Sequence, residues 1–160
     1  MDGWPEEVER VSTFLRASGA EARIEEFAVE TATAADAARA VGCEVGEIVK
    51  SLILLCDDRP VLALVPGDRR GDTGKIARAA GATEARVAHA REVPALTGFA
   101  PGAVAPFPLE HVGRALIDRV LLAYDEVWVG AGSTRHMAVL PPRELVRLTK
   151  AAPADLIMRD

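Results

Sequence analysis

Hydrophobic and polar positions alternate along the chain with two different periods. Near the start, apolar residues recur at helical spacing, which predicts a helix over residues 5–18 with Gly19 just past its end. Residues 22–29 alternate loosely and favour a strand. Thr33 and Asp36 resemble a capping box with Asp in place of Glu. They predict a short Ala-rich helix that ends at Gly42.

The strongest strand signal is the apolar run at residues 48–56, which is typical of a strand covered on both faces. A polar turn at 57–60 and a second apolar run at 61–65 predict a hairpin. Asp72 is expected to cap a helix that ends before Gly81. Short strands are predicted at 86–89, 115–117, 126–129 and 136–140, and helices at 92–97 and 142–151.

The segment Gly98–Pro108 holds five Gly or Pro residues in eleven, so it can form neither a helix nor a central strand and must be a structured loop. Helices interleave with hairpins and do not alternate strictly with strands. The order of elements therefore predicts a single α+β domain over residues 1–160, with a mixed, strongly curved β-sheet flanked by helices.

Composition narrows the class of protein. The chain has 160 residues, 49% of them hydrophobic, with a net charge of −5. This excludes a disordered chain and a disulfide scaffold, and it argues against a general nucleic-acid coating protein. Cys43 and Cys56 show no metal or redox spacing, which favours a reducing, cytoplasmic setting. The chain shows neither a signal peptide nor an apolar run long enough for a membrane span, so no membrane partner is expected.

Lysine is rare: the 19 basic residues include only three, Lys50, Lys75 and Lys150. Lys75 and Lys150 fall on predicted helices, where surface roles suffice. Lys50 lies in the apolar strand and shares a face with Leu52 and Leu54. Either its ammonium reaches water at the end of the strand, or it projects into a cleft and binds a carboxylate, phosphate or carbonyl oxygen.

Two glycine-containing segments are further candidates for a binding site. In the loop Gly98–Pro108, Gly102 would let a ligand approach the main chain closely, although the loop could equally be a rigid connection. Gly130–Ser133 follows a strand and could cradle a phosphate or ribose, but a tight hairpin turn is favoured. Arg69 and Arg70 could grip phosphates or be solvated charges. The three histidines show no metal spacing, and no metal or cofactor is predicted.

Lys50 and the loop Gly98–Pro108, called the glycine loop below, occur in an order that resembles the YbaK/EbsC family, the free-standing relatives of the editing domain of bacterial prolyl-tRNA synthetases. Four sets of short stretches within residues 33–150 carry the likeness: Thr33–Ala38 with Val41-Gly42, Ile48–Leu52, Thr97–Phe99 with Gly102–Phe107, and Val127–Gly132 with Pro141–Thr149. Within them, Val49–Leu52 is similar to the family's V-K-[ST]-L strand, and Gly102–Pro106 to its G-x-x-x-P loop. The resemblance implies the family's fold, which we expect to be a barrel-like sheet flanked by helices.

The same resemblance implies a trans-acting deacylase that hydrolyses the ester of a mischarged tRNA without a metal or a covalent intermediate. Lys50 would then be catalytic, and the aminoacyl end would contact Gly102, Ala103, Val104, Ala105, Pro106, Gly130 and Gly132. Arg69 and Arg70 would contact tRNA phosphates. Small amino acids such as Ala, Cys or Ser on tRNA-Pro or a related tRNA are the expected substrates, and a synthetase is a candidate partner.

Two departures from the family pattern keep alternatives open. Ala105 stands where many relatives carry Ser, and Gly130-Ala131-Gly132 replaces Ser-Gly-Gly or Gly-Gly-Gly. A non-catalytic module that binds an aminoacyl-tRNA, a nucleotide-like ligand or a protein is therefore the second hypothesis. A third is a small-molecule enzyme that forms a Schiff base on Lys50, which requires a neutral, desolvated lysine.

Overall fold

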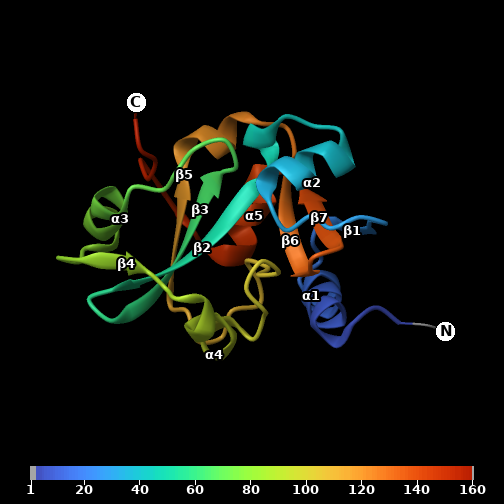
Figure 1. Ribbon diagram of the computed structural model, residues 1–160, viewed down its shortest axis with the longest axis horizontal. Coiled ribbons are helices and arrows are strands. Elements are labelled where there is room, and N and C mark those ends of the chain that lie inside the picture. Colours follow the sequence, from blue (N-terminus) through green and yellow to red (C-terminus); the bar gives the residue numbers. More distant parts are fainter. Residues whose placement is uncertain (1–2, 160) are drawn as a thin grey trace.

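The fold combines short helices with two β-sheets, as Figure 1 shows for the computed structural model, which describes residues 3–159. The α-helices are α1 (Glu6–Ala17), α2 (Ala34–Val41), α3 (Thr73–Ala80), α4 (Val93–Thr97) and α5 (Pro142–Thr149). The 3-10 helices are η1 (Val45–Glu47), η2 (Ala90–Glu92) and η3 (Arg119–Ala123). The strands are β1 (Arg23–Glu26), β2 (Val49–Cys56), β3 (Arg59–Pro66), β4 (Ala85–Val87), β5 (Arg114–Asp118), β6 (Val127–Ser133), β7 (His136–Leu140) and β8 (Ala152–Ala154).

The larger sheet has the order β4-β2-β3-β5-β8 and is mixed, because β2 pairs antiparallel with β3 and β4 whereas β5 pairs parallel with β3 and β8. The smaller sheet has the order β1-β7-β6 and is antiparallel. An isolated parallel bridge between Ile48 and Trp128 joins the two at one corner. The α+β class and the mixed sheet are confirmed.

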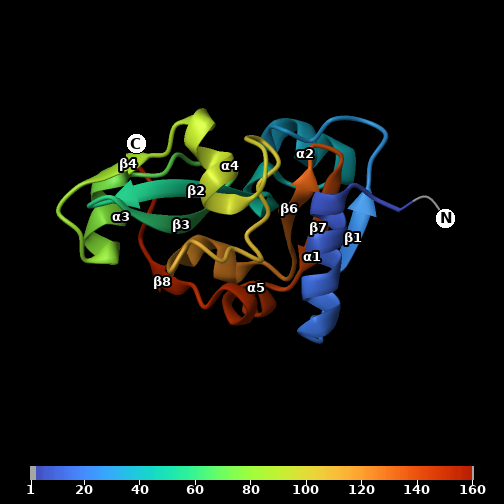
Figure 2. The same cartoon turned by 90° about the horizontal axis from the view of Figure 1, so that it is seen from below.

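The prediction of a barrel-like sheet is wrong, since the strands form two open sheets that diverge from the Ile48–Trp128 bridge. Figures 1 and 2 show the loop that follows α4 lying in the space between the sheets. Two buried phenylalanines of this loop, Phe99 and Phe107, belong to the core cluster that also holds β2 and β6 residues. Side chains from a loop therefore fill the gap that further strand pairing would have closed.

Both faces of β2 are covered, as the apolar run predicts. Val49 and Ile53 belong to the core shared with the glycine loop and β6, whereas Leu54 and Cys56 belong to a second core with Ile76 of α3. Lys50 has the same parity as Leu54 and Cys56, so it leaves β2 on the α3 side.

Most predicted elements form within a few residues of their expected bounds. One local prediction is wrong: Gly130–Ser133 is not a hairpin turn but the end of β6, where the pairing with β7 shifts register between Gly130 and Ser133. The helix predicted to reach residue 151 ends at Thr149, since Lys150 adopts the left-handed conformation with φ 58°. Over residues 3–159, no helix combines the length and the apolar character that crossing a membrane demands.

A buried carboxylate ties the last helix to the start of the chain. The Oε1 atom of Glu144 accepts hydrogen bonds from the Glu21 amide at 2.9 Å and from Arg147, and Oε2 accepts one from Arg147 Nε at 2.6 Å. These donors, with the Arg147 guanidinium foremost, lower the pKa of Glu144 to about 2. The ionised form is therefore strongly favoured in the folded chain.

We expect Glu144→Gln to lower the free energy of unfolding by about 1 to 3 kcal/mol at pH 7, because charge-assisted hydrogen bonds are lost. The wild-type contribution is fully present above pH 4.5, the ordinary glutamate pKa, and is lost as pH falls toward 2. Urea unfolding at several pH values measures both effects. The exposed Glu126→Gln serves as the control, and equal stability of the two variants at pH 7 would refute this role.

Candidate active site

Lys50 lies at the start of β2, opposite Val65 of β3. After β3 the chain turns back over this end of the strand, and the Gly67 amide donates to the Ile48 carbonyl at 2.7 Å. A Cβ at Gly67 would lie 2.6 Å from the Val45 carbonyl oxygen, so only glycine allows this close approach. The turn brings the Arg69 carbonyl within 2.5 Å of Lys50 Nζ, which donates a hydrogen bond to it.

The groups around Lys50 shift the pKa of its ammonium in opposite directions. Burial lowers the pKa of the Lys50 ammonium, the Asp68 carboxylate acts to raise it, and the Arg70 guanidinium lowers it further. The side chain is half-buried, so the group is neither a solvated surface charge nor a neutral amine sealed in the core. A cation in such a place favours an anionic or strongly polarised oxygen as its ligand.

A pocket of about 200 Å³ opens beside Lys50 between the two sheets. Its walls come from the segment before α2, the start of β2, the glycine loop, and strands β6 and β7. It is lined by Thr31, Ala32, Thr33, Ala34, Ile48, Val49, Lys50, Ser51, Leu52, Gly102, Val104, Gly130 and Met137. Of the predicted site residues, this pocket brings together Lys50, Gly102, Val104 and Gly130.

The pocket follows an open edge of β2. The Ile53 carbonyl accepts a hydrogen bond from Ala88 on this edge, and pairing with β4 begins only at Leu54. Because alternate residues of a strand direct their amide and carbonyl groups to the same edge, those of Ser51 face the pocket. The Ser51 hydroxyl is buried and has no hydrogen-bond partner within the described residues. The main chain at Ser51 and the Lys50 ammonium are thus polar groups that this strand offers to a ligand.

The glycine loop is fixed at both ends. The Phe99 ring is buried under the Arg10 guanidinium, whose carbon lies 4.5 Å from the ring centroid, and Phe107 stacks on Phe14 with centroids 5.4 Å apart. Between them Gly102 adopts φ 81°, a conformation that favours glycine. The loop therefore forms a wall whose shape is set by packing.

The remaining predicted pocket residues lie elsewhere. Ala103 and Ala105 are buried, and Pro106 borders a different cavity, beside Phe107. Gly132 packs against α1, where a Cβ would lie 2.9 Å from the Glu7 carbonyl. Alternation along the loop explains the split, since residues next to those facing the pocket point into the core.

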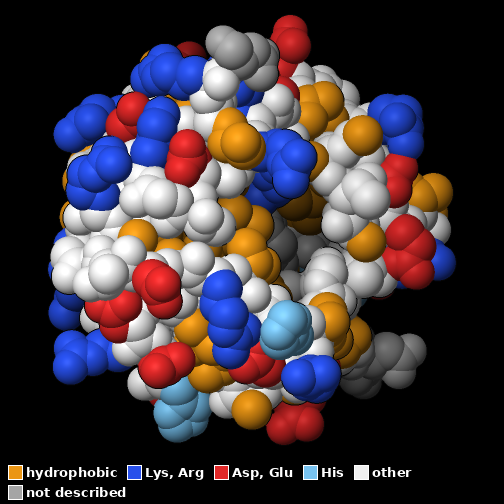
Figure 3. Space-filling model, turned by 60° about the vertical axis from the view of Figure 1, so that its left-hand side comes forward, with side chains coloured by type: hydrophobic (Ala, Val, Ile, Leu, Met, Phe, Trp, Pro, Cys, Tyr) orange, Lys and Arg blue, Asp and Glu red, His pale blue; other side chains and the backbone are white. Residues whose placement is uncertain are grey.

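Arg69 and Arg70 lie on the turn after β3 but differ in availability. The Arg69 guanidinium donates to the Met158 carbonyl at 2.7 Å, whereas Arg70 is exposed. Figure 3 shows Lys and Arg side chains gathered on one part of the drawn face, with acidic side chains among them, and a hollow with a Lys or Arg side chain at its rim. The surface is therefore mixed in charge, with Arg70 the freer of the two arginines.

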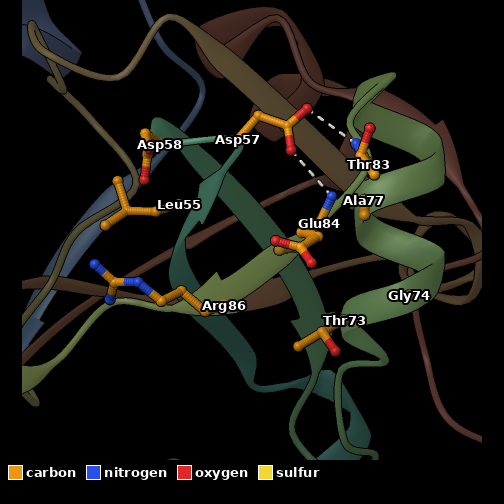
Figure 4. A pocket seen from close by; sticks show the side chains of 10 residues that line it. Leu55, Asp57, Asp58, Thr73, Gly74, Ala77, Thr83, Glu84 and Arg86 are labelled. Carbon is orange, nitrogen blue, oxygen red and sulfur yellow. Dashed lines mark hydrogen bonds between the residues drawn. The ribbon is translucent and has the colours of Figure 1, made fainter.

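A larger cavity of about 600 Å³ lies at the other end of β2, between the β2–β3 turn, α3 and β4. Figure 4 shows the Asp57 carboxylate directed at the main chain of Thr83 and Glu84, with hydrogen bonds of 2.9 and 3.0 Å to their amides. The side chain of Arg86 is paired with Glu92. These groups have structural partners, and the cavity lies away from Lys50. Within residues 3–159, no three His, Cys, Asp or Glu side chains are grouped to hold a metal.

Sequence reasoning missed two parts of the pocket, the segment Thr31–Ala34 and Met137 of β7. The sequence marks part of the first as a helix cap and as part of the family likeness, and the Thr33 hydroxyl indeed accepts a hydrogen bond from the Asp36 amide at 3.0 Å. Met137 pairs across the small sheet with Gly130, so its place depends on strand register. A hydrophobic pattern alone carries no signal for either role.

The Lys50 ammonium thus lies beside a small pocket whose walls include main-chain groups of the glycine loop and β6. Residues 28–148 match the aminoacyl-tRNA editing domain, and the chain therefore belongs to this family. EbsC of Enterococcus faecalis, a proposed Cys-tRNA(Pro)/Cys-tRNA(Cys) deacylase, is 26% identical over 129 residues, which cover 80% of this chain and 79% of that protein. The resemblance to the YbaK/EbsC family is confirmed.

Two further comparisons agree. A proline–tRNA ligase of Lactobacillus gasseri is 33% identical over 89 residues, 56% of this chain but only 16% of the ligase. The crystal structure of a proposed trans-editing enzyme for prolyl-tRNA synthetase superimposes with a TM-score of 0.91 at 39% identity, over 98% of this chain and 100% of that one. The fold is thus the editing-domain fold.

The contact between β6 and the glycine loop allows a structural test. A Cβ at Gly130 would lie 2.6 Å from the Val104 carbonyl oxygen. We expect Gly130→Ala to displace Val104 in a crystal structure and to lower the free energy of unfolding by about 1 to 3 kcal/mol. Gly113→Ala is the matched control, because a Cβ there meets nothing within 4 Å. Unchanged positions of residues 102–104 in Gly130→Ala would contradict the close packing.

Proposed function

We propose that this protein is a trans-editing aminoacyl-tRNA deacylase, which hydrolyses the ester between a wrongly attached amino acid and the 3′ end of a tRNA. One observation carries the proposal: the Lys50 ammonium borders a small pocket walled by Gly102, Val104 and Gly130 in a chain of the editing family. The site suits an ester carbonyl, which has no charge before reaction and gains negative charge during it.

Lys50 would act on that developing charge. When water attacks the carbonyl carbon, the carbonyl oxygen becomes an oxyanion, and an ammonium already in place stabilises it more than it stabilises the ester. Collapse of the intermediate breaks the bond to the ribose oxygen and releases the amino acid and the tRNA. The family resemblance implies that the terminal ribose hydroxyl of the tRNA helps to activate the water.

The pocket favours a small amino acid. Its volume of about 200 Å³ is below the range typical of sites for larger ligands. The main chain at Gly102 and at the open β2 edge would bind the α-amine and the carbonyl group. We therefore propose Ala, Cys or Ser as the amino acid removed, on tRNA-Pro or a related tRNA.

The rest of the tRNA would contact the turn after β3. Arg70 is exposed beside Lys50, which supports a contact between its guanidinium and phosphates near the 3′ end, and Arg69, whose guanidinium donates to Met158, would be the second contact. The net charge of −5 is unfavourable for a large tRNA interface. A synthetase that delivers the tRNA would compensate, and the activity then belongs in the cytoplasm, where tRNA is charged.

The alternative of a non-catalytic module draws its support from the departures at Ala105 and Ala131. Both side chains are fully buried in the core cluster and neither lines the pocket. These substitutions therefore leave the pocket surface beside Lys50 intact, which favours the enzyme over the binding module.

We expect the wild type to deacylate at least one of Ala-, Cys- and Ser-tRNA-Pro, and Lys50→Ala to lower the rate about 10² to 10³-fold through loss of the oxyanion's cation. Release of radiolabelled amino acid measures this. Lys150→Ala is the matched control, because it removes an exposed lysine from the end of α5.

The outcomes separate the hypotheses. Full activity of Lys50→Ala would refute the catalytic role of Lys50. Binding of the charged tRNAs without hydrolysis of any of them would favour the non-catalytic module. Covalent trapping of a carbonyl substrate by borohydride would favour a Schiff base at Lys50 and overturn the oxyanion role.

The pH dependence gives an independent test. The ammonium exists below its pKa, and burial lowers the pKa of Lys50 from the ordinary 10.5. The enzymatic rate, corrected for spontaneous ester hydrolysis, should therefore fall as pH rises, with a midpoint below 10.5. The residual activity of Lys50→Arg should lack this fall, because a guanidinium stays charged. An alkaline midpoint shared by the wild type and Lys50→Arg would assign the titration to another group.

A further inference from the structure

The end of the chain folds back onto the turn that holds Lys50. We call residues 155–158 the C-terminal clasp and residues 69–72 the lysine loop. The Asp72 amide donates to the Leu156 carbonyl at 2.8 Å, and the Met158 amide donates to the Arg70 carbonyl at 2.8 Å. Gly71 and Ile157 form an antiparallel bridge between these bonds. The two segments thus pair like short strands.

Side chains lock this pairing from both directions. The Arg69 guanidinium donates to the Met158 carbonyl at 2.7 Å. From α3, Lys75 Nζ donates to the Ile157 carbonyl at 2.8 Å and to Asp155 Oδ2 at 3.1 Å. Lys75 is therefore not the free surface charge that its helical position predicts, since its side chain is only 22% exposed.

The clasp is anchored in the protein core. Leu156 and Ile157 are buried with Leu54 and Ile76 in the core beneath α3. The Leu156 amide also donates to the buried Asp118 carboxylate at 2.8 Å. The clasp is thus a rigid support, whereas the lysine loop is a polar turn that depends on its neighbours.

We propose that the C-terminal clasp, held by Lys75, positions the Lys50 ammonium for catalysis by fixing the Arg69 carbonyl to which Lys50 donates. Arg69 connects Lys50 to the clasp directly. Its carbonyl accepts a hydrogen bond from Lys50 Nζ, and its guanidinium donates one to the Met158 carbonyl of the clasp. Lys75 is a positioning residue. The clasp lies beyond residue 148, where the match to the editing-domain model ends.

The proposal rests on the proposed deacylase function for its kinetic consequence, but its structural part can be measured separately. With three lysines in the chain, ¹³C-labelled lysine gives a small set of ε-methylene signals that substitution of each lysine assigns. In the wild type we expect the two ε-protons of Lys50 to have distinct shifts, because the side chain is held in one orientation. In Lys75→Met they should average to one shift.

The kinetic arm separates positioning from binding. If the wild type deacylates a charged tRNA, Lys75→Met should lower kcat about tenfold with KM changed less than about twofold, since a misplaced group costs rate more than affinity. Lys75→Arg should restore most of kcat, because a guanidinium can still reach the Ile157 carbonyl. Arg114→Met is the control. It removes the hydrogen bond from the Arg114 guanidinium to the Ala79 carbonyl of α3, the helix that carries Lys75, without touching the clasp.

Distinct failures have distinct meanings. Unchanged Lys50 signals in folded Lys75→Met would overturn the clasp whatever the activity. An inactive wild type in which Lys75→Met still averages the Lys50 signals would overturn the proposed function and leave the clasp standing. A change in KM alone, or an equal loss in Arg114→Met, would overturn the positioning role. If Lys75→Met fails to fold, the same spectra and kinetics on Asp155→Asn decide the question, because this variant removes the ion pair with Lys75, and Arg159→Met, which removes the second ion pair of Asp155, is its control.

Discussion

The site exists because two sheets touch at one bridge and then separate. Ile48 pairs with Trp128, but from the next residue onward β2 and β6 diverge, and the main chain of β2 keeps an open edge until β4 joins it. An unpaired strand edge inside a folded chain is costly unless it is covered or solvated. Here it borders a pocket, so the same divergence that prevents a closed barrel supplies polar main-chain groups next to Lys50.

The charge of Lys50 depends on a balance between the cost of burying the ammonium and its favourable contacts. Full burial would neutralise the amine, and full exposure would leave its charge screened by water. The structure holds it halfway, with a carbonyl acceptor and an acidic neighbour against the cost of desolvation. The acceptor is the Arg69 carbonyl, which belongs to the turn after β3, and residues 155–158 form hydrogen bonds with this turn. The position of one ammonium thus depends on β3, α3 and the last residues together.

Local patterns predict most of this fold and only part of the site. Continuous apolar sequence marks β2, and the Gly and Pro content marks the loop from Gly98, because both are properties of neighbouring residues. Sheet closure, the register at Gly130 and the role of Lys75 depend on contacts between distant segments, which no local pattern encodes. Ala103 and Ala105 were assigned to the pocket as part of a motif, whereas alternation along the loop directs them into the core.

The wall formed by the glycine loop has a consequence for how such a pocket changes over evolution. Phe99 and Phe107 fix its ends, and the Val104 carbonyl lies too close to Gly130 for any added side-chain atom. The main-chain wall therefore leaves no room for a larger residue at Gly130, and the side chains beside it differ, since Val104 is partly exposed whereas Met137 is buried against Ile48. Exchange of Val104 would therefore reshape the pocket with little effect on the frame, whereas exchange of Met137 would also disturb the packing beneath α2.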